Sequence, residues 1–227
     1  MKALEKIASP SAPHVFVDGH ELRIDGVSRS FGARLVLHGV SLRVEAGQVA
    51  ALVGPNGSGK TTLLRILAGV LDPSSGSVSV WGRAPGQGIA GYVPAGDRML
   101  NWRLTGRENL RFFARIRGAA GDVDAAVVAA AQTTGSVGLL DKRAGECSTG
   151  QRRRLILAVA FLGSPPVVLI DEPFSDLDEE GCMAVDAACR AWSTAGGLVL
   201  YAAPRRVDGP RADVVFRFAH GRFLEEA

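Results

Sequence analysis

The stretch Gly54-Pro55-Asn56-Gly57-Ser58-Gly59-Lys60-Thr61-Thr62 decides the fold of this chain. It fills the phosphate-loop pattern, in which four residues separate two glycines and a lysine and a hydroxyl residue follow. The apolar run Val49 to Val53 precedes the loop, and Leu63-Leu64-Arg65-Ile66-Leu67 follows it with helical character. A strand, a glycine-rich loop and a helix in this order predict a phosphate-binding site.

Each residue type in this loop has a physical reason. Glycines let successive backbone N–H groups curl around a phosphate, where a Cβ would block the approach. The helix that we expect to begin near Lys60 directs its positive end at the same phosphates. The Lys60 ammonium adds charge for the β- and γ-oxygens, and the Thr61 hydroxyl is placed to bind Mg²⁺. The sequence therefore predicts that Gly54 to Thr62 bind a nucleoside triphosphate.

Composition sets the limits for the rest of the chain. Its 227 residues, 47% hydrophobic and 22% charged, suit one α/β domain or one domain with an inserted subdomain. The net charge of +3 favours a solvated surface over a nucleic-acid patch. Cys147, Cys182 and Cys189 have no metal or disulfide spacing, which favours reduced thiols in a cytosolic compartment.

The sequence shows no apolar run near the roughly 18 residues that cross a bilayer. Its first twenty residues lack the charged-then-apolar layout of a secretory signal. If the protein serves a membrane, we expect it to do so through another chain.

The order of elements predicts the architecture. Residues 1–19 are expected to be a flexible N-terminal extension, ahead of one domain over residues 20–227. The alternating runs Glu21 to Ile24 and Val40 to Val44 predict half-buried antiparallel strands. Residues from about 94 to 162 are helix-rich, after which strands and helices alternate again. We expect an α/β fold: a P-loop core with a mixed sheet, an antiparallel β subdomain and an inserted helical subdomain.

A second signal follows the buried strand Val167 to Ile170, which ends in Asp171-Glu172-Pro173. A carboxylate at the carboxyl end of a parallel strand lies beside the phosphate loop. Asp171 is expected to hold Mg²⁺ through water, and Glu172 is the candidate general base for an attacking water. Without the phosphate loop, the same acidic pair would indicate a helix cap or a solvated sheet edge.

A third signal is Cys147-Ser148-Thr149-Gly150-Gln151-Arg152-Arg153-Arg154-Leu155. Small polar residues and a glycine lead into a predicted helix, so its N-terminus is open to an anion. The apolar positions fall on a broad face of that helix: Leu155, Leu157, Ala158, Phe161 and Leu162. Because this segment lies far from its own phosphate loop, a second subunit arranged head-to-tail is expected.

With these three motifs in this order, residues from about 21 to 225 resemble the nucleotide-binding subunit of an ATP-binding cassette (ABC) transporter. The resemblance implies that Ser148, Gly150 and Gln151 form the signature loop, which contacts the γ-phosphate held by the partner's Lys60. Ser175-Asp176-Leu177-Asp178 is similar to the D-loop, so Ser175, Asp176 and Asp178 are expected at the dimer interface.

The resemblance also gives Phe31 a role. This residue stands seven residues before His38 and matches the aromatic position that stacks on adenine. A core phenylalanine at the end of the first hairpin is the alternative interpretation. The stretch Trp102 to Ala114 is similar to the ABC-2-type branch, in which the ATPases of small exporters serve a separate permease chain.

Two residues that the family usually carries are missing. Ala95 stands where a glutamine binds Mg²⁺, with Asp97 or Arg98 as candidates for part of its role. Ala202-Ala203-Pro204 stands where a histidine touches the γ-phosphate. Cys147 and Thr149 also depart from the leucine and glycine of the usual signature. These departures predict slow turnover with intact nucleotide binding.

The resemblance implies an ATP-hydrolysing subunit that binds ATP and Mg²⁺, dimerises and powers a separate membrane permease, which we expect to be of exporter type. Such a subunit is cytoplasmic and attached to the cytoplasmic face of the membrane through the permease. The alternative is a degenerate cassette with weak hydrolysis, acting as the partner of another cassette or as a regulatory module. A cassette ATPase acting on nucleic acid or ribosomes is disfavoured, because such proteins mostly carry two cassettes or long coiled insertions.

Overall fold

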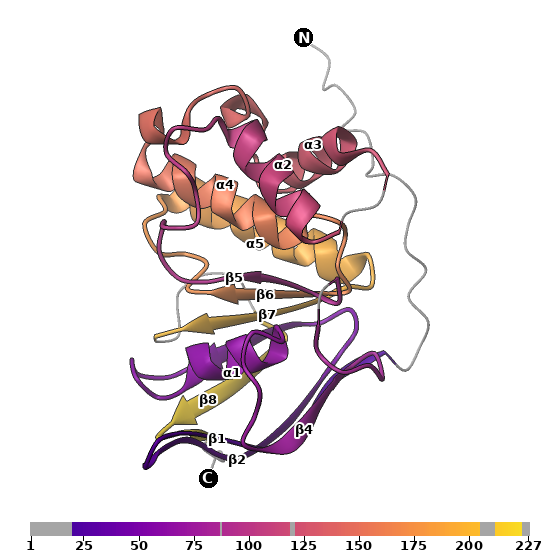
Figure 1. Cartoon of the computed structure of the whole chain (residues 1–227), viewed down its shortest axis with the longest axis vertical. Helices are drawn as coiled ribbons and strands as arrows, with labels where there is room; N and C mark the ends of the chain where they lie inside the picture. The colour runs from indigo at the N-terminus through magenta and orange to yellow at the C-terminus, as the bar shows by residue number, and fades with distance from the viewer. Residues whose placement is uncertain (1–19, 87, 119–120, 205–211, 224–227) are drawn as a thin grey trace.

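The computed structural model describes residues 20–86, 88–118, 121–204 and 212–223 (Figure 1). The predicted extension, residues 1–19, lies outside these ranges. Within them the strands form two sheets. The antiparallel sheet has the order β2-β1-β4, with β1 at Glu21–Phe31, β2 at Arg34–Glu45 and β4 at Ser75–Val80. The mixed sheet has the order β5-β6-β7-β3-β8-β9.

The mixed sheet contains a parallel set of strands. Its members pair in parallel from β5 through β6, β7 and β3 to β8, whereas β9 is antiparallel to β8. The carboxyl ends of the parallel strands therefore share one edge. The strands are β3 (Val49–Val53), β5 (Ala90–Val93), β6 (Val167–Asp171), β7 (Leu198–Ala203), β8 (Val214–Ala219) and β9 (Arg222–Phe223).

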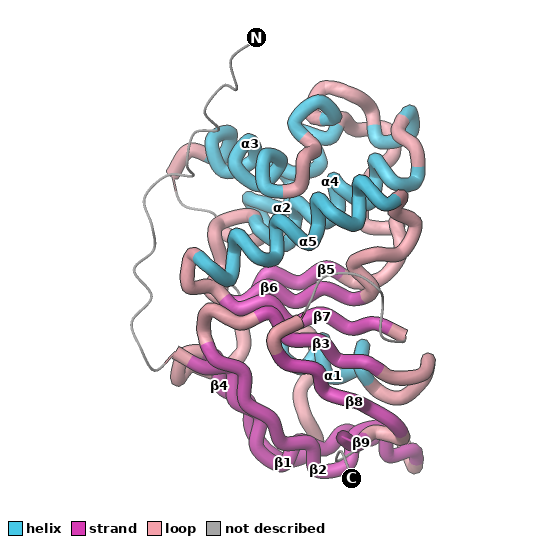
Figure 2. The backbone as a smooth tube through the Cα atoms, turned by 180° about the vertical axis from the view of Figure 1, so that it is seen from behind, coloured by secondary structure: helices cyan, strands magenta, loops and turns pink. Residues whose placement is uncertain are grey.

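Helices lie on both sides of the mixed sheet (Figures 1 and 2). Helix α1 (Lys60–Leu67) lies between the two sheets, and four helices form a layer on the opposite face. That helical layer comprises α2 (Gly106–Ile116), α3 (Val123–Thr133), α4 (Thr149–Phe161) and α5 (Glu179–Thr194), with short 3₁₀ helices at Val137–Leu139 and Ala144–Glu146.

Two hydrophobic cores follow from the alternation of side chains along the buried strands. In β6, Val168 and Ile170 pack into the core under the helical layer. Val167 and Leu169 pack into the core shared with α1 and the antiparallel sheet. Every residue of β6 is buried, as expected for a strand with both faces covered. This is the predicted α/β fold with a mixed sheet and an antiparallel sheet.

The first two strands are longer than the sequence indicated. Their pairing register shifts between Ile24 and Val27 and again before Ser30. Each shift inserts an extra residue and breaks the period-two pattern on which the prediction relied. Gly26 and Gly39 take positive φ angles of 58° and 64° within these strands.

The second half of helix α4 is buried on all sides. Its residues from Leu155 to Phe161 are all buried, whereas the sequence predicted one broad apolar face. The predicted apolar positions are buried, and burial extends to the residues between them because α2 and α3 contact the helix as well as α5, β5 and β6. Small residues such as Ala158 and Ala160 allow this close packing.

The closest approach between α4 and the sheet is at Gly91 in β5. A Cβ placed there would lie 1.8 Å from the carbonyl oxygen of Ala160 and 2.8 Å from a ring carbon of Pro165. A side chain at this position therefore requires the helix and the strand to move apart.

We expect Gly91→Ala to lower the free energy of unfolding by about 1–3 kcal/mol, the usual cost of overpacking a core. Denaturant unfolding of the purified protein measures this change. Gly138→Ala is the matched control, since a Cβ at this exposed position would meet no atom within 4 Å. Equal losses in the two variants would show that the Gly91 contact does not determine stability.

Candidate functional site

The phosphate loop connects β3 to α1, as its flanking sequence predicted. Gly59 is the N-cap of α1 and has a φ of 107°, a conformation that side chains rarely adopt. The Ser58 hydroxyl is buried and has no hydrogen-bond partner among the described residues. An unsatisfied buried hydroxyl in this loop is a donor available to a bound anion.

Lys60 lies inside the loop, with 6% of its surface exposed. Its ammonium donates to the carbonyl oxygens of Gly54 at 2.6 Å and of Pro55 at 2.9 Å. Burial lowers the pKa of Lys60, and the carboxylates of Asp171 and Glu172 act in the opposite direction. The ammonium is therefore held at the mouth of the loop, where phosphate oxygens can take over its hydrogen bonds.

Thr61 and Asp171 are in direct contact although 110 residues separate them in sequence. The Thr61 hydroxyl donates to Oδ2 of Asp171 at 2.7 Å. Burial raises the pKa of Asp171, and the Thr61 hydrogen bond opposes this shift. A hydroxyl and a carboxylate side by side supply the kind of oxygen ligands that Mg²⁺ prefers.

Glu172 directly follows β6 and has a φ of 51°, in the left-handed region. Its backbone N–H donates to the carbonyl oxygen of Ala202 at 2.9 Å. Its Oε2 accepts a hydrogen bond from the Ser175 hydroxyl at 3.1 Å. Non-glycine residues adopt this backbone conformation only where surrounding contacts hold it, often at functional sites.

These groups line one pocket of about 350 Å³. The predicted residues at its wall are Asn56, Gly57, Gly59, Lys60, Thr61, Thr62, Asp171 and Glu172. Arg34 and Val36, from the start of β2, also line it and were missed by the sequence analysis. No motif marks them, because they reach the pocket only through the fold of the first hairpin.

Phe31 lies at the end of β1, with 48% of its surface exposed. This exposure argues against the alternative of a core phenylalanine. The Arg29 guanidinium carbon lies 4.8 Å from the ring centroid, in cation–π geometry. The ring keeps exposed surface on which a planar group can stack.

The signature residues lie at the start of α4 and do not line the pocket of their own chain. Ser148 is the N-cap, and its hydroxyl accepts a hydrogen bond from the Gln151 N–H in a capping box. Oε1 of Gln151 accepts from the Ser148 N–H and from Lys142, each at 3.1 Å. The structure therefore groups Ser148, Gly150 and Gln151 with one another, away from Lys60.

The predicted D-loop runs between Glu172 and α5. Ser175 contacts Glu172, and Asp178 is the N-cap of α5, accepting a hydrogen bond from the Gly181 N–H at 2.8 Å. Asp176 has a φ of 62°, and its carbonyl oxygen lies 3.4 Å from the position of a Cβ on Gly150. The D-loop is thus adjacent to the signature residues within one chain.

The two positions that lack the family's usual glutamine and histidine lie after β5 and at the end of β7. Ala95 follows β5, and the nearby Asp97 pairs with Arg152 at 3.2 Å. This pairing occupies the carboxylate that was a candidate for the role of the missing glutamine. The carbonyl oxygen of Ala203 accepts a hydrogen bond from the Gly54 N–H at 3.3 Å.

The site fits a nucleoside triphosphate with Mg²⁺. Phosphate oxygens could accept hydrogen bonds from Lys60, from the unpaired Ser58 hydroxyl and from backbone N–H groups at the N-terminus of α1. Thr61 and Asp171 would supply the oxygen ligands that Mg²⁺ prefers. In the described ranges, no helix is long and apolar enough to cross a membrane.

Residues 37–175 match the family model described as ABC transporter. The cytochrome c biogenesis ATP-binding export protein CcmA of Rhodobacter capsulatus is 41% identical over 182 residues, covering 80% of this chain and 79% of that protein. The protein of the same name from Saccharophagus degradans is 35% identical and covers 80% and 86%. The Nod factor export ATP-binding protein I of Rhizobium sp. (strain N33) is 32% identical and covers 88% and 68%.

Solved structures show the same fold. An ATP-binding subunit of an ABC transporter superposes with a TM-score of 0.78 at 24% identity, covering 91% of this chain and 89% of that chain. A bacterial Atm1-family ABC exporter with ATP bound gives a TM-score of 0.78 at 27% identity, covering 98% of this chain and 41% of that chain. The present chain thus corresponds to less than half of that exporter chain.

We expect Lys60→Met to weaken the affinity for a fluorescent ATP analogue about 10- to 100-fold, the effect of losing a charge-assisted hydrogen bond of about 1.5–3 kcal/mol. Equilibrium titration measures this affinity. Arg43→Met, on an exposed position of β2, is the control that removes a positive charge elsewhere. Unchanged affinity in Lys60→Met would exclude the lysine from the phosphate site.

Proposed function

Because this chain belongs to the ABC transporter family, we propose that it is an ATP-hydrolysing subunit that powers a separate membrane permease. The observation that carries the proposal is the contact of Thr61 with Asp171 beside Lys60 and Glu172 in one pocket. It joins a triphosphate site, a cation site and a candidate base. Different residues would thereby bind the phosphates (Lys60), hold the cation (Thr61 and Asp171) and activate the water (Glu172).

In the proposed reaction, each of these groups acts on a different part of the ATP and water. Water attacks the γ-phosphorus while one of its protons passes to the Glu172 carboxylate, and the bond to the β–γ bridging oxygen breaks. Lys60 stabilises the charge on the β- and γ-oxygens, and Thr61 and Asp171 would hold Mg²⁺. Bound Mg²⁺ neutralises part of the triphosphate charge. The products are ADP and inorganic phosphate.

The proposal includes a head-to-tail dimer in the ATP-bound state. The α4 N-terminus carries Ser148 and Gly150 but does not line its own pocket, which supports a role against the γ-phosphate of a partner subunit. Ser175, Asp176 and Asp178 would lie at the interface, between this N-terminus and Glu172. ATP then acts as the bridge between the subunits.

We further propose export as the direction of transport and attachment to the cytoplasmic face through the permease. Export is supported by the names of two relatives, the cytochrome c biogenesis export protein CcmA and the Nod factor export protein. Permease docking is proposed for the region from Gly96 to Asn109, where Trp102 has 54% of its surface exposed. We also propose residues 20–227 as one ATPase domain with a helical subdomain at about 94–162.

A degenerate cassette is the second candidate. It is favoured by Ala95 and by Ala202-Ala203-Pro204, which stand where the family usually carries a glutamine and a histidine, and by the ion pair of Asp97 with Arg152. Such a chain would bind ATP and dimerise with a fully equipped cassette, with weak hydrolysis of its own.

We expect Phe31→Ala to weaken ATP affinity about 5- to 100-fold, because base stacking on an aromatic ring contributes about 1–3 kcal/mol. Phe112→Ala is the matched control, since Phe112 is also exposed but lies on α2 in the helical layer. Equilibrium titration with ATP and with triphosphate alone separates adenine from phosphate binding. Equal affinities for ATP in the two variants would disprove stacking on Phe31.

We expect activity per subunit to rise with protein concentration, because each pocket needs a partner's signature loop.

Glu172→Gln should lower turnover at least about 100-fold with ATP affinity unchanged, because the base is lost while the phosphate contacts remain. Steady-state ATPase assays test both points, with Glu45→Gln on an exposed position of β2 as control. ATP binding without measurable hydrolysis by the unmodified chain would instead support the degenerate cassette.

A further inference from the structure

Arg153 of α4 is the largest fully buried side chain of the described residues, with 2% of its surface exposed. Its two terminal nitrogens reach in different directions. Nη1 donates to the carbonyl oxygens of Pro94 at 3.3 Å and Gly96 at 3.1 Å. Nη2 donates to the carbonyl oxygens of Asp171 at 2.8 Å and Glu172 at 2.6 Å. One guanidinium thus joins α4 to the loop after β5 and to the end of β6.

The contact with Glu172 is made at a strained point of the backbone. Glu172 has a φ of 51°, in the left-handed region that non-glycine residues seldom adopt. Four hydrogen bonds hold it there. The Ala202 carbonyl accepts from its N–H, and the Ser175 hydroxyl donates to its carboxylate. The Ser175 N–H, at 3.3 Å, and the Arg153 guanidinium both donate to its carbonyl oxygen. Of these, Arg153 makes the shortest hydrogen bond and supplies the only charged donor.

The charge and the shape of this guanidinium both suit its role as a hydrogen-bond donor to two loops. Burial lowers the pKa of Arg153, while the carboxylates of Asp171, Asp176 and Glu172 act to raise it. Arginine stays protonated under any physiological condition, so the fork remains a donor. A planar fork with two terminal nitrogens can span both loops, which a lysine ammonium cannot do with the same geometry.

We propose that Arg153 is a positioning residue for ATP hydrolysis, which holds the Glu172 backbone in its left-handed conformation and so directs the carboxylate into the pocket. This inference rests on the proposed role of Glu172 as the base. It adds that the orientation of the base depends on α4, the helix whose N-terminus carries Ser148 and Gly150. The loop at Pro94 to Gly96 is tied to the same guanidinium.

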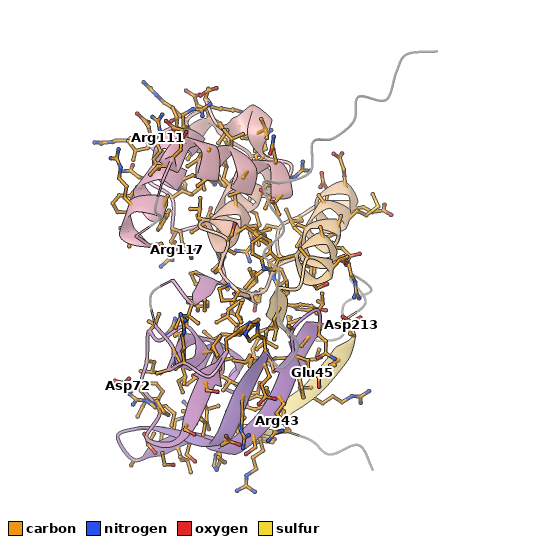
Figure 3. All side chains as sticks on the ribbon, turned by 90° about the vertical axis from the view of Figure 1, so that its right-hand side faces the viewer. Arg43, Glu45, Asp72, Arg111, Arg117 and Asp213 are labelled. Atoms are coloured by element: carbon orange, nitrogen blue, oxygen red, sulfur yellow. The ribbon has the colours of Figure 1, made fainter. Side chains whose placement is uncertain are left out.

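The chain offers a matched control in Arg117, at the C-terminus of α2. This side chain is also largely buried, and it donates to the backbone carbonyls of Val159 and Tyr92. Burial lowers its pKa to about 10. Figure 3 shows Arg117 where the helical layer meets the sheets, whereas Arg111 lies at the outer surface. Arg117 therefore ties α2 to the sheet without touching Asp171 or Glu172.

The experiment compares Arg153→Met with Arg117→Met in thermal unfolding, ATP affinity and steady-state hydrolysis. We expect both variants to lose stability, since each leaves backbone carbonyls unpaired. Only Arg153→Met should lower kcat, by about 10- to 100-fold, the range expected for a displaced catalytic group. Its KM should stay within about twofold, because the phosphate contacts are unchanged. In a Glu172→Gln background, Arg153→Met should cause no further loss of turnover.

Arg153→Lys keeps the positive charge. It replaces Arg153→Met in the same measurements if Arg153→Met does not fold. We expect it to retain part of the turnover, because an ammonium can still reach one of the two loops. Equal reductions of kcat in the Arg153 and Arg117 variants would overturn the proposal, as would an additive loss in the Glu172→Gln background. If the unmodified chain hydrolyses no ATP, the proposed function fails. A crystal structure of the Arg153 variant then decides the inference: a φ at Glu172 that stays near 51° overturns it, and a relaxed φ supports it.

Discussion

The parallel pairing of β7 with both β3 and β6 is the constraint on which the site depends. The carbonyl oxygens of two consecutive residues at the end of β7 accept hydrogen bonds from the two functional loops: Ala202 from Glu172, and Ala203 from Gly54. These bonds fix the distance and register between the phosphate loop and the acidic end of β6. The contact of Thr61 with Asp171 follows from that register.

The part of the site that the sequence predicted is the part built from continuous segments. A glycine-rich loop between a strand and a helix, and an acidic pair after a buried strand, each have a local pattern. Parallel sheets bring such segments to one edge, so the contact of Thr61 with Asp171 could be expected. Arg34 and Val36 could not, because they reach the pocket through a hairpin whose bulges hide its length in the sequence.

The three consecutive arginines of α4 show the limit of local patterns most clearly. Successive residues of a helix point about 100° apart, so a run of one residue type can have three environments. Arg152 pairs with Asp97 and lies over the Trp102 ring, and Arg154 lies near Asp178 and Glu180. Arg153 alone points inward. Such a run ordinarily indicates a solvated face, and only the packing of α4 on one side, at Arg153, separates its members.

The site therefore divides into two parts with different mechanical supports. Lys60 and Thr61 sit on α1, which follows β3, whereas Asp171 ends β6 and its carbonyl oxygen accepts a hydrogen bond from Arg153. The Glu172 carboxylate depends in addition on α4, through the hydrogen bond of Arg153 to its carbonyl. A shift of the helical layer against the sheet would then alter hydrolysis more than nucleotide binding. Because α4 also begins at the signature residues, the proposed contact with a partner subunit would act on the same helix that we propose to orient the base.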